Sequence, residues 1–351
     1  MSERLRCGVI GTGARGLQHL DSILHCPRSV AVGIADISAE RAKEAAERYK
    51  LARSYLDYHD LLDQPDIDAV TIAVPDHLHA KIACEAIKAR KHVFLESPMA
   101  LNVKEASRIA EASKKARRTF MVSQPYRFHR ETQAVKALVQ KNDLGDIYHA
   151  RCFWLRRSGI PRIGSWFTQK QTSAGGCLAH EGLHMLDTCL HLLGEFEVKS
   201  VFAQTAARFG PRGAGEGTWG HGEIHPKRLF EVEDYGVALL KLKSGKTIQL
   251  ESSWAGNFPA DGRQRGVDLF GTTGSVSVFP ARIFRSGLQG QEIVHLNLPE
   301  PAHAEDAIHH FATCVVDGKK PAVTIEESLR LQKVLDGMYA SASSGKEVRM
   351  T

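Results

Sequence analysis

The first 125 residues alternate between short apolar runs and stretches with helical spacing. The runs are rich in β-branched residues and lie at 5–10, 30–35, 69–74, 92–95 and 119–122. Between them, residues 39–49 and 81–89 carry apolar side chains at helical intervals. Short strands that are apolar on both faces, joined by helical crossovers, predict a parallel sheet covered by helices on both sides.

From about residue 147 the pattern changes to longer strands in which apolar and polar positions alternate. These strands are expected at 147–154, 198–206, 237–243, 247–254, 267–271 and 275–279. Short glycine-containing turns between them predict a largely antiparallel sheet. Helices are predicted at 176–193, 303–316 and 325–343. The stretch 208–228 is rich in Gly, Pro and His without periodicity, which predicts a long surface loop.

The two patterns predict an α/β protein of two domains, because 351 residues exceed what one core usually holds. We place a doubly wound parallel domain at 1–124. An α/β domain with an open, mainly antiparallel sheet follows at 125–351. The helix at about 325–343 is a candidate to pack back on the first domain.

Composition narrows the class of protein. Hydrophobic residues make up 43% of the chain and charged residues 25%, the balance of a globular protein. No apolar run approaches the roughly 18 residues of a membrane span, and the N-terminal residues lack a signal-peptide pattern, so we expect a cytoplasmic protein. Seven scattered cysteines without a CxxC pair predict neither disulfides nor a zinc knuckle. The net charge of +6 is dispersed, which predicts no nucleic-acid partner and mildly favours anionic ligands.

A glycine-rich motif follows the first predicted strand directly and precedes a helical run. It has the form G-x-G-x-x-G and consists of Gly11, Thr12, Gly13, Ala14, Arg15 and Gly16. In this context the glycines allow a tight turn and the approach of a pyrophosphate to a helix N-terminus. Asp36 ends the second strand, where a carboxylate accepts hydrogen bonds from ribose hydroxyls. Because Ile37 and not a basic residue follows, NAD is favoured over NADP as the cofactor.

Three further motifs resemble the signatures of the glucose–fructose oxidoreductase, inositol dehydrogenase and rhizopine catabolism (Gfo/Idh/MocA) family. They lie at 74–79, 91–98 and 175–187, and their order and spacing match over essentially the whole chain. The resemblance implies an N-terminal Rossmann domain, homodimers or homotetramers, and sugars, polyols or their derivatives as substrates of nicotinamide chemistry. It also implies cofactor contacts from Val74, Pro75, Glu96, Ser97 and Pro98. His79 is a candidate either for a contact near the cofactor or for a packed structural residue.

The chain departs from the family pattern at two polar positions. Family members usually read Glu-Lys-Pro where this chain has Glu96-Ser97-Pro98. A serine hydroxyl offers only a neutral hydrogen bond where an ammonium would stabilise alkoxide charge. His180 stands in the family's aspartate position, and His184 retains the histidine position. The resemblance therefore leaves His184 to move a proton, with His180 and Tyr126 as candidate partners.

Two further hypotheses about polar residues remain open. The segment from His180 to His184 matches H-E-x-x-H, the helical zinc motif, but the later residues of the extended motif are absent and no metal is expected. A second group, Arg156, Arg157 and Arg162, is a candidate clamp for an anionic group of the substrate or a solvated surface cluster. Trp166 lies in the same family-like segment and joins the candidate substrate-binding residues.

The first functional prediction is an NAD-dependent oxidoreductase acting on a hydroxyl of a sugar or polyol in carbohydrate metabolism. The alternative is an NAD-dependent glycosidase or lyase, which oxidises a glycoside transiently and recycles NAD. The altered polar positions are compatible with it, since some relatives with this chemistry also lack the lysine. A third hypothesis is that the protein is a sensor, which binds NAD without turnover.

Overall fold

The computed structural model describes residues 4–220, 222–259, 262–287, 290–296, 298 and 306–350. The chain divides into two compact units, each made of two segments. Unit 1 comprises Met1–Ser123 and Ala304–Leu329, and unit 2 comprises Gln124–His303 and Arg330–Thr351. Among the described residues, no helix is long and apolar enough to cross a membrane.

Unit 1 contains a six-stranded parallel sheet, as its apolar runs predict. The strand order is β3-β2-β1-β4-β5-β6. The strands are β1 (Leu5–Ile10), β2 (Ser29–Ala35), β3 (Ser54–Tyr55), β4 (Ala69–Ile72), β5 (His92–Leu95) and β6 (Phe120–Val122). All four residues of β4 are buried, because helices cover both faces of the sheet. The predicted doubly wound fold is confirmed, and only the two-residue β3 was not anticipated.

Helices connect these strands and cover the sheet of unit 1. They are α1 (Ala14–His25), α2 (Ala39–Tyr49), α3 (Tyr58–Leu62), α4 (Asp76–Lys88) and α5 (Val103–Ala116). The crossovers β1–α1–β2 and β4–α4–β5 run in opposite directions along the sheet, so their right-handedness places α1 and α4 on opposite faces. Helix α5 packs beside α4.

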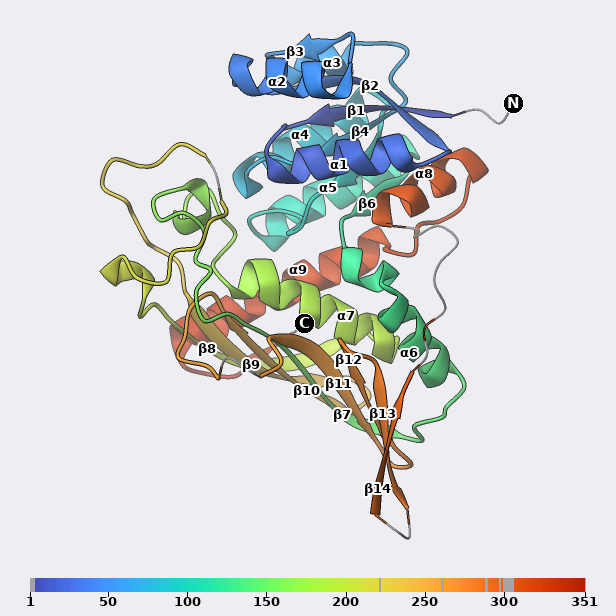
Figure 1. Cartoon of the computed structure of the whole chain (residues 1–351), viewed down its shortest axis with the longest axis vertical. Coiled ribbons are helices and arrows are strands. Elements are labelled where there is room, and N and C mark those ends of the chain that lie inside the picture. The colour runs from blue at the N-terminus through green and yellow to red at the C-terminus, as the bar shows by residue number, and fades with distance from the viewer. Residues whose placement is uncertain are drawn as a thin grey trace. The chain divides into compact units, whose positions relative to one another are not determined.

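A late segment of the chain completes unit 1. Helix α8 (Ala307–Asp317) lies against α1 in Figure 1, and Phe311 packs on Phe94 with ring centroids 5.6 Å apart. The first residues of helix α9 (Ile325–Ser344) also contact the core of unit 1. Residues 304–329, which the sequence analysis assigned to the second domain, thus group with the first, because their apolar side chains cover its sheet. Residues 303–305 of the predicted helix at 303–316 lie outside the described part.

Unit 2 is built on a nine-stranded mixed sheet. The order is β14-β13-β12-β11-β7-β10-β9-β8-β15. The strands are β7 (Ile147–Leu155), β8 (Val198–Ala206), β9 (Tyr235–Leu242), β10 (Thr247–Ser253), β11 (Arg265–Gly271), β12 (Ser275–Val278), β13 (Arg282–Gly287), β14 (Gly290–His295) and β15 (Val348–Arg349). All neighbours pair antiparallel except β7 and β10, which run parallel. The carboxyl ends of these two strands therefore meet at one edge of the sheet.

Helices cover one face of the sheet of unit 2 (Figure 1). They are α6 (Arg130–Gln140), α7 (Leu183–Leu193) and the later part of α9. On the other face Tyr148, Phe202 and Leu239 are exposed. The alternating burial along β9 follows from this one-sided cover.

The predicted surface loop at 208–228 contains little regular structure. A 3-10 turn at Gly210–Arg212 is followed by an isolated bridge between Ile160 and Glu216. His221 lies outside the described residues. Asp234 holds the start of the loop, because its carboxylate accepts backbone N–H bonds from Arg208, Phe209 and Gly210.

Candidate functional site

The glycine-rich turn of unit 1 has the close approaches that its motif requires. A Cβ atom on Gly16 would lie 1.8 Å from the carbonyl oxygen of Gly11, and one on Gly11, whose φ is +89°, would lie 2.3 Å from the carbonyl oxygen of Ala73. Gly13, in contrast, faces open space. The turn leads straight into α1, where Arg15 is exposed and bonds Gln18. These residues fit a dinucleotide pyrophosphate over Gly13 at the helix N-terminus.

Asp36 organises the end of β2. Its carboxylate accepts hydrogen bonds from Thr12, through both the backbone N–H at 2.8 Å and the hydroxyl at 2.9 Å, and from the Ser38 N–H at 2.8 Å. Arg41 adds an ion pair at 2.7 Å. Burial acts to raise the pKa of Asp36, but the hydrogen bonds from Arg41, Thr12 and Ser38 outweigh it and lower this pKa below its usual value. Asp36 is therefore a stable carboxylate beside the glycine-rich turn.

The sequence pattern does not mark Arg41, because the position expected to bear on cofactor preference is the one directly after Asp36. The helical geometry of α2 brings a residue five positions later onto the same carboxylate. Arg41 leaves 46% of its side chain exposed, so its guanidinium is also accessible to a ligand. An arginine at this place is the kind of residue that accommodates a ribose 2′-phosphate.

The residues implied to contact the cofactor also meet at the carboxyl edge of this sheet. Val74 and Pro75 follow β4, and Glu96 follows β5. His79 is buried and links the two turns, since its ring nitrogens lie 2.8 Å from the Pro98 carbonyl oxygen and 2.9 Å from that of Val74. Burial lowers the pKa of His79 despite these two acceptors. His79 thus holds both turns in place from inside the fold.

Glu96 is bound from the helix that follows the glycine-rich turn. His19 of α1 lies 2.8 Å from its carboxylate, and the Ser97 N–H donates to the other oxygen at 3.2 Å. His19 was not singled out in the sequence, because a lone histidine in a helix resembles a packed core residue. The contact connects the turn after β5 with helix α1 through one side-chain pair.

The candidate residues of unit 2 gather where β7 and β10 end. A π-helical turn, Leu178–Gly182, precedes α7 and carries His180 and Glu181. The Glu181 carboxylate is buried, pairs with Arg156 at 3.1 Å and accepts a hydrogen bond from the indole of Trp254, which follows β10. These contacts fix the turn to the ends of both parallel strands.

A buried acid further along the chain fixes the start of the same turn. Glu233 accepts N–H bonds from Gly176 and Leu178, both at 3.0 Å, and the hydroxyl of Tyr339 at 2.8 Å. A Cβ atom on Gly176 would lie 1.9 Å from the carbonyl oxygen of Glu233, so only glycine permits this approach. Burial raises the pKa of Glu233. No local pattern marks Glu233, because its partners lie more than 50 residues away in sequence.

His184 is the second residue of α7 and lies beside Tyr126. Its Nδ1 lies 3.2 Å from Oε1 of Gln124, and the rings of His184 and Tyr126 are 5.7 Å apart. Arg127 is buried and forms a two-pronged ion pair with Asp187, one turn further along α7. This pair ties the 3-10 helix Pro125–Phe128 to α7 and so holds Tyr126 against His184.

His180 has aromatic surroundings. Its ring lies 5.1 Å from that of Phe167, 5.9 Å from Trp254 and 6.0 Å from Trp166, measured between centroids. Its Nε2 is 3.0 Å from the hydroxyl of Ser173. Trp166 in turn stacks on Phe167 at 3.7 Å. The sequence-predicted residues His180 and Trp166 thus belong to one aromatic wall.

The three arginines proposed as a clamp differ in their contacts. Arg156 is held by Glu181 and lies over the rings of Trp154 and Trp219, at 5.3 and 5.1 Å. Arg157 and Arg162 are exposed. The sequence pattern does not mark a fourth arginine, Arg265. Its guanidinium lies over the rings of Tyr126, Trp154 and Phe279, within 5.8 Å of their centroids. It borders a pocket of about 620 Å³ lined in part by His129 and Glu131.

The acidic residue of the H-E-x-x-H segment has other partners in the structure. Both oxygens of Glu181, the would-be base, are bonded to Arg156 and Trp254. Within the described ranges, no group of three or more His, Cys, Asp or Glu side chains is placed to hold a metal ion.

Comparison with known proteins agrees with this division of the chain. Residues 5–124 match a family model described as an oxidoreductase family with an NAD-binding Rossmann fold, and residues 132–277 match the GFO/IDH/MocA C-terminal domain. D-glucoside 3-dehydrogenase of Escherichia coli is 27% identical over 99% of this chain and 98% of its own length. An uncharacterized oxidoreductase of Rhizobium meliloti is 34% identical over 97% and 98%. A solved structure of levoglucosan dehydrogenase in complex with NADH shares the fold, with a TM-score of 0.85 at 23% identity over 99% of this chain and 100% of that one.

Proposed function

Because the chain belongs to the Gfo/Idh/MocA family of oxidoreductases, with an NAD(P)-binding Rossmann domain, we propose that it oxidises a hydroxyl group of a sugar or polyol with NAD. The observation that carries the proposal is the contact of His184 with Tyr126 and Gln124 in unit 2. A relative named as a glucoside dehydrogenase supports a sugar substrate. A cytoplasmic homo-oligomer is part of the same proposal.

In this proposal the protein accepts the proton of the substrate hydroxyl at His184. Oε1 of Gln124 can only accept, so Nδ1 of His184 donates to it and the neutral ring has its basic lone pair on Nε2. Tyr126 limits rotation of the ring from one side. NAD, when bound, supplies the hydride acceptor. A positioned base of this kind typically contributes a factor of about 10² to 10⁴ in rate.

The aromatic wall around His180 is proposed to bind the substrate ring. Sugars present C–H faces that pack on indole and phenyl rings, while their hydroxyls need polar partners at the rim. Trp166 and Phe167 supply the apolar surface, and His180 and Ser173 supply polar atoms 3.0 Å apart within it. Arg156 is proposed to orient Trp154 and Trp219 and not to clamp an anion, because Glu181 already neutralises it.

In unit 1 we propose that Asp36 receives the adenosine ribose and that the N-terminus of α1 receives the pyrophosphate. A permanent carboxylate repels a 2′-phosphate, which favours NAD. Arg41 works in the opposite direction, since it offsets the charge of Asp36. The proposal is therefore a preference for NAD that depends on the balance of these two side chains.

The test is to follow NADH by absorbance while purified protein and NAD are presented with a panel of sugars, polyols and glycosides. The proposal expects NADH to accumulate in proportion to the substrate oxidised. Cleavage of a glycoside without net NADH would assign the redox-neutral glycosidase or lyase reaction instead. Tight NAD binding with neither product across the panel would favour a sensor.

A further inference from the structure

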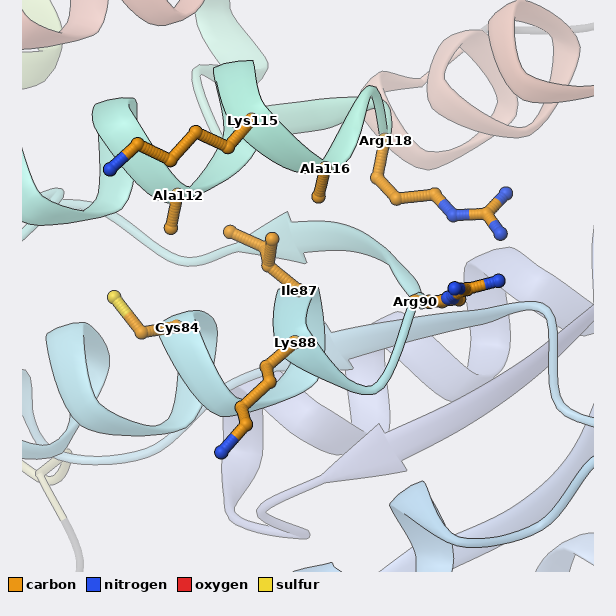
Figure 2. A pocket seen from close by; sticks show the side chains of 8 residues that line it. All are labelled: Cys84, Ile87, Lys88, Arg90, Ala112, Lys115, Ala116 and Arg118. Atoms are coloured by element: carbon orange, nitrogen blue, oxygen red, sulfur yellow. The ribbon is translucent and has the colours of Figure 1, made fainter.

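The α4/α5 groove is a concave surface of unit 1 with a volume of about 480 Å³. It lies between the C-terminal halves of α4 and α5 and the turns that follow them. Its charged residues are Lys88, Arg90, Lys115 and Arg118, and Ile87 and Ala112 form its apolar floor. Figure 2 shows the two guanidinium groups together at one end and the two lysines flanking the floor from opposite helices.

All four charged residues of the groove are cations, and no carboxylate lines it. Elsewhere arginines such as Arg53 and Arg127 are paired with aspartates. In the part of the chain that the structure describes, none of the four groove cations forms an ion pair. Four like charges around one concavity repel each other, and an anion placed among them removes that repulsion.

Arg118 has hydrogen-bonding capacity to offer a ligand. Its guanidinium lies 3.4 Å from Nε2 of His92, but Nδ1 of the same ring accepts the Thr119 N–H at 3.1 Å. Burial and the charge of Arg118 lower the pKa of His92 to about 4, so the ring is neutral near pH 7. A neutral imidazole that accepts at Nδ1 carries its proton on Nε2 and cannot also accept there. The Arg118 N–H groups are therefore not used by His92.

Helix capping explains only part of this cluster. Cations near a helix C-terminus interact favourably with its unsatisfied carbonyl groups, which accounts for Lys88 in the last turn of α4 and Lys115 in the last turn of α5. Arg90 and Arg118 lie beyond those helices, and Figure 2 shows their guanidinium groups at the same end of the groove. Two guanidinium groups at one end of a groove suit the oxygens of a phosphate, which accepts from several donors at once.

We propose that the α4/α5 groove binds a phosphorylated small molecule, with its phosphate groups between Arg90 and Arg118 and its less polar part on Ile87 and Ala112. The groove is of the size that small ligands occupy. The charged ends and apolar floor together favour an organic phosphate over a free inorganic ion. Lys88 and Lys115 flank the floor and contribute longer-range attraction.

This site is separate from the proposed cofactor site. The groove lies where β5 and β6 begin, at the amino edge of the parallel sheet. The glycine-rich turn and Asp36 follow the ends of β1 and β2, at the carboxyl edge. The proposal therefore does not rest on the proposed dehydrogenase activity, and it is tested with NAD saturating the other edge.

Cys84 provides a chemical probe, because it lines the groove while the other six cysteines are buried. Its burial raises the pKa of the thiol, so labelling with a maleimide is run in mildly alkaline buffer. The experiment measures the labelling rate of Cys84 in the full-length protein with saturating NAD and increasing ATP as the organic phosphate. Adenosine, a short acidic peptide and a single-stranded oligonucleotide are the comparison probes.

The proposal expects ATP to slow labelling by about tenfold or more at saturation, while adenosine does not. Substituting both arginines, Arg90→Glu with Arg118→Glu, is expected to weaken ATP binding at least about tenfold, since charge-assisted hydrogen bonds are lost. The control is Lys114→Glu, an exposed lysine of α5 that does not line the groove. If the double variant unfolds, Arg90→Gln with Arg118→Gln replaces it.

Three results would overturn the proposal. The first is no protection by ATP at millimolar concentration, and the second is protection that persists undiminished in the double variant. The third is protection by the acidic peptide or the oligonucleotide without protection by ATP, which would assign the groove to a macromolecule. Protection that weakens as salt rises from about 0.05 to 0.3 M would agree with the charge-based contact.

Discussion

His180 and His184 are four residues apart yet have different surroundings. His180 lies among Trp166, Phe167 and Trp254, whereas His184 contacts Tyr126 and Gln124. Sequence spacing alone pairs them as metal ligands, because residues at i and i+4 usually share a helix face. These different neighbours support the proposal that His180 packs on the substrate ring and that His184 accepts the proton.

Replacing His184 with Ala is expected to lower kcat by a factor of about 10² to 10⁴ and to leave NAD affinity nearly unchanged. The proton acceptor is lost, while the residues proposed to hold the dinucleotide belong to unit 1. Steady-state rates on an identified substrate and a separate NAD titration check both parts. His149→Gln is the matched control, because His149 lies near the amino end of β7 and the candidate site residues lie at its carboxyl end. A variant that keeps its rate within about threefold would show that the proton goes elsewhere and would make Tyr126 the next residue to test.

Cofactor preference is expected to respond in opposite directions to Asp36→Ala and Arg41→Ala. Loss of the carboxylate removes the repulsion of a 2′-phosphate and the acceptor for ribose hydroxyls, so NADP gains relative to NAD. Loss of the guanidinium leaves the carboxylate charge without its partner, so the preference for NAD increases. Calorimetric titration of both cofactors against both variants measures the two shifts. Equal or tighter NADP binding by the unaltered protein would contradict the proposal.

At the scale of elements, the strands of unit 1 were predictable and the turn before α7 was not. β4 is buried at every position because both faces are covered, and its run of small and β-branched residues indicates this in the sequence. The predicted helix at 176–193 instead begins as a π-helical turn, and the acid that holds it, Glu233, is distant in sequence. The same limit applies to His19 and Arg265, whose contacts bring together elements far apart in the chain.

Glu233→Gln is expected to change how stability depends on pH. The folded-state pKa of Glu233 is raised, so its stabilising contribution is complete below the unfolded pKa of about 4.5 and is lost as pH rises toward the folded value. Glutamine mimics the protonated acid and does not titrate. The two proteins should therefore be similarly stable near pH 4, and the variant should gain on the unaltered protein as pH rises. Urea unfolding across this range measures the difference, and a gap that narrows with rising pH would contradict the assignment.

At the scale of the molecule, the chain leaves unit 1 at residue 123 and returns to it at residue 304. The sequence pattern predicts the boundary near 124 and a second domain at 125–351, with the helix at about 325–343 as a candidate to pack back on the first domain. The amphipathic pattern of a helix shows that it has an apolar face and not which core that face covers. In the structure Phe311 and Ile325 both pack on apolar residues of unit 1, so the apolar faces of their helices contact the core of that unit.

Phe311→Ala is expected to destabilise unit 1 by about 3 to 5 kcal/mol, the usual cost of removing a buried phenyl ring. The loss should appear as a lower unfolding midpoint that NAD binding partly restores, because a ligand stabilises the state to which it binds. Differential scanning calorimetry with and without NAD measures both effects. Phe202→Ala, on the exposed face of the other sheet, is the control. A cost below about 1 kcal/mol would mean that α8 is not needed to complete the core.

The divided construction of unit 1 has a consequence for synthesis on the ribosome. The strands of this unit are complete once residue 122 has emerged, but the helix that covers Phe94 comes only after residue 306. At about 5 to 20 residues per second, the intervening translation takes on the order of 10 to 40 s. During that interval the nascent sheet exposes an uncovered apolar surface, a state in which chaperones bind and misfolding begins. The order of the segments along the chain thus delays the completion of unit 1 during synthesis, and this delay leaves no trace in the folded structure.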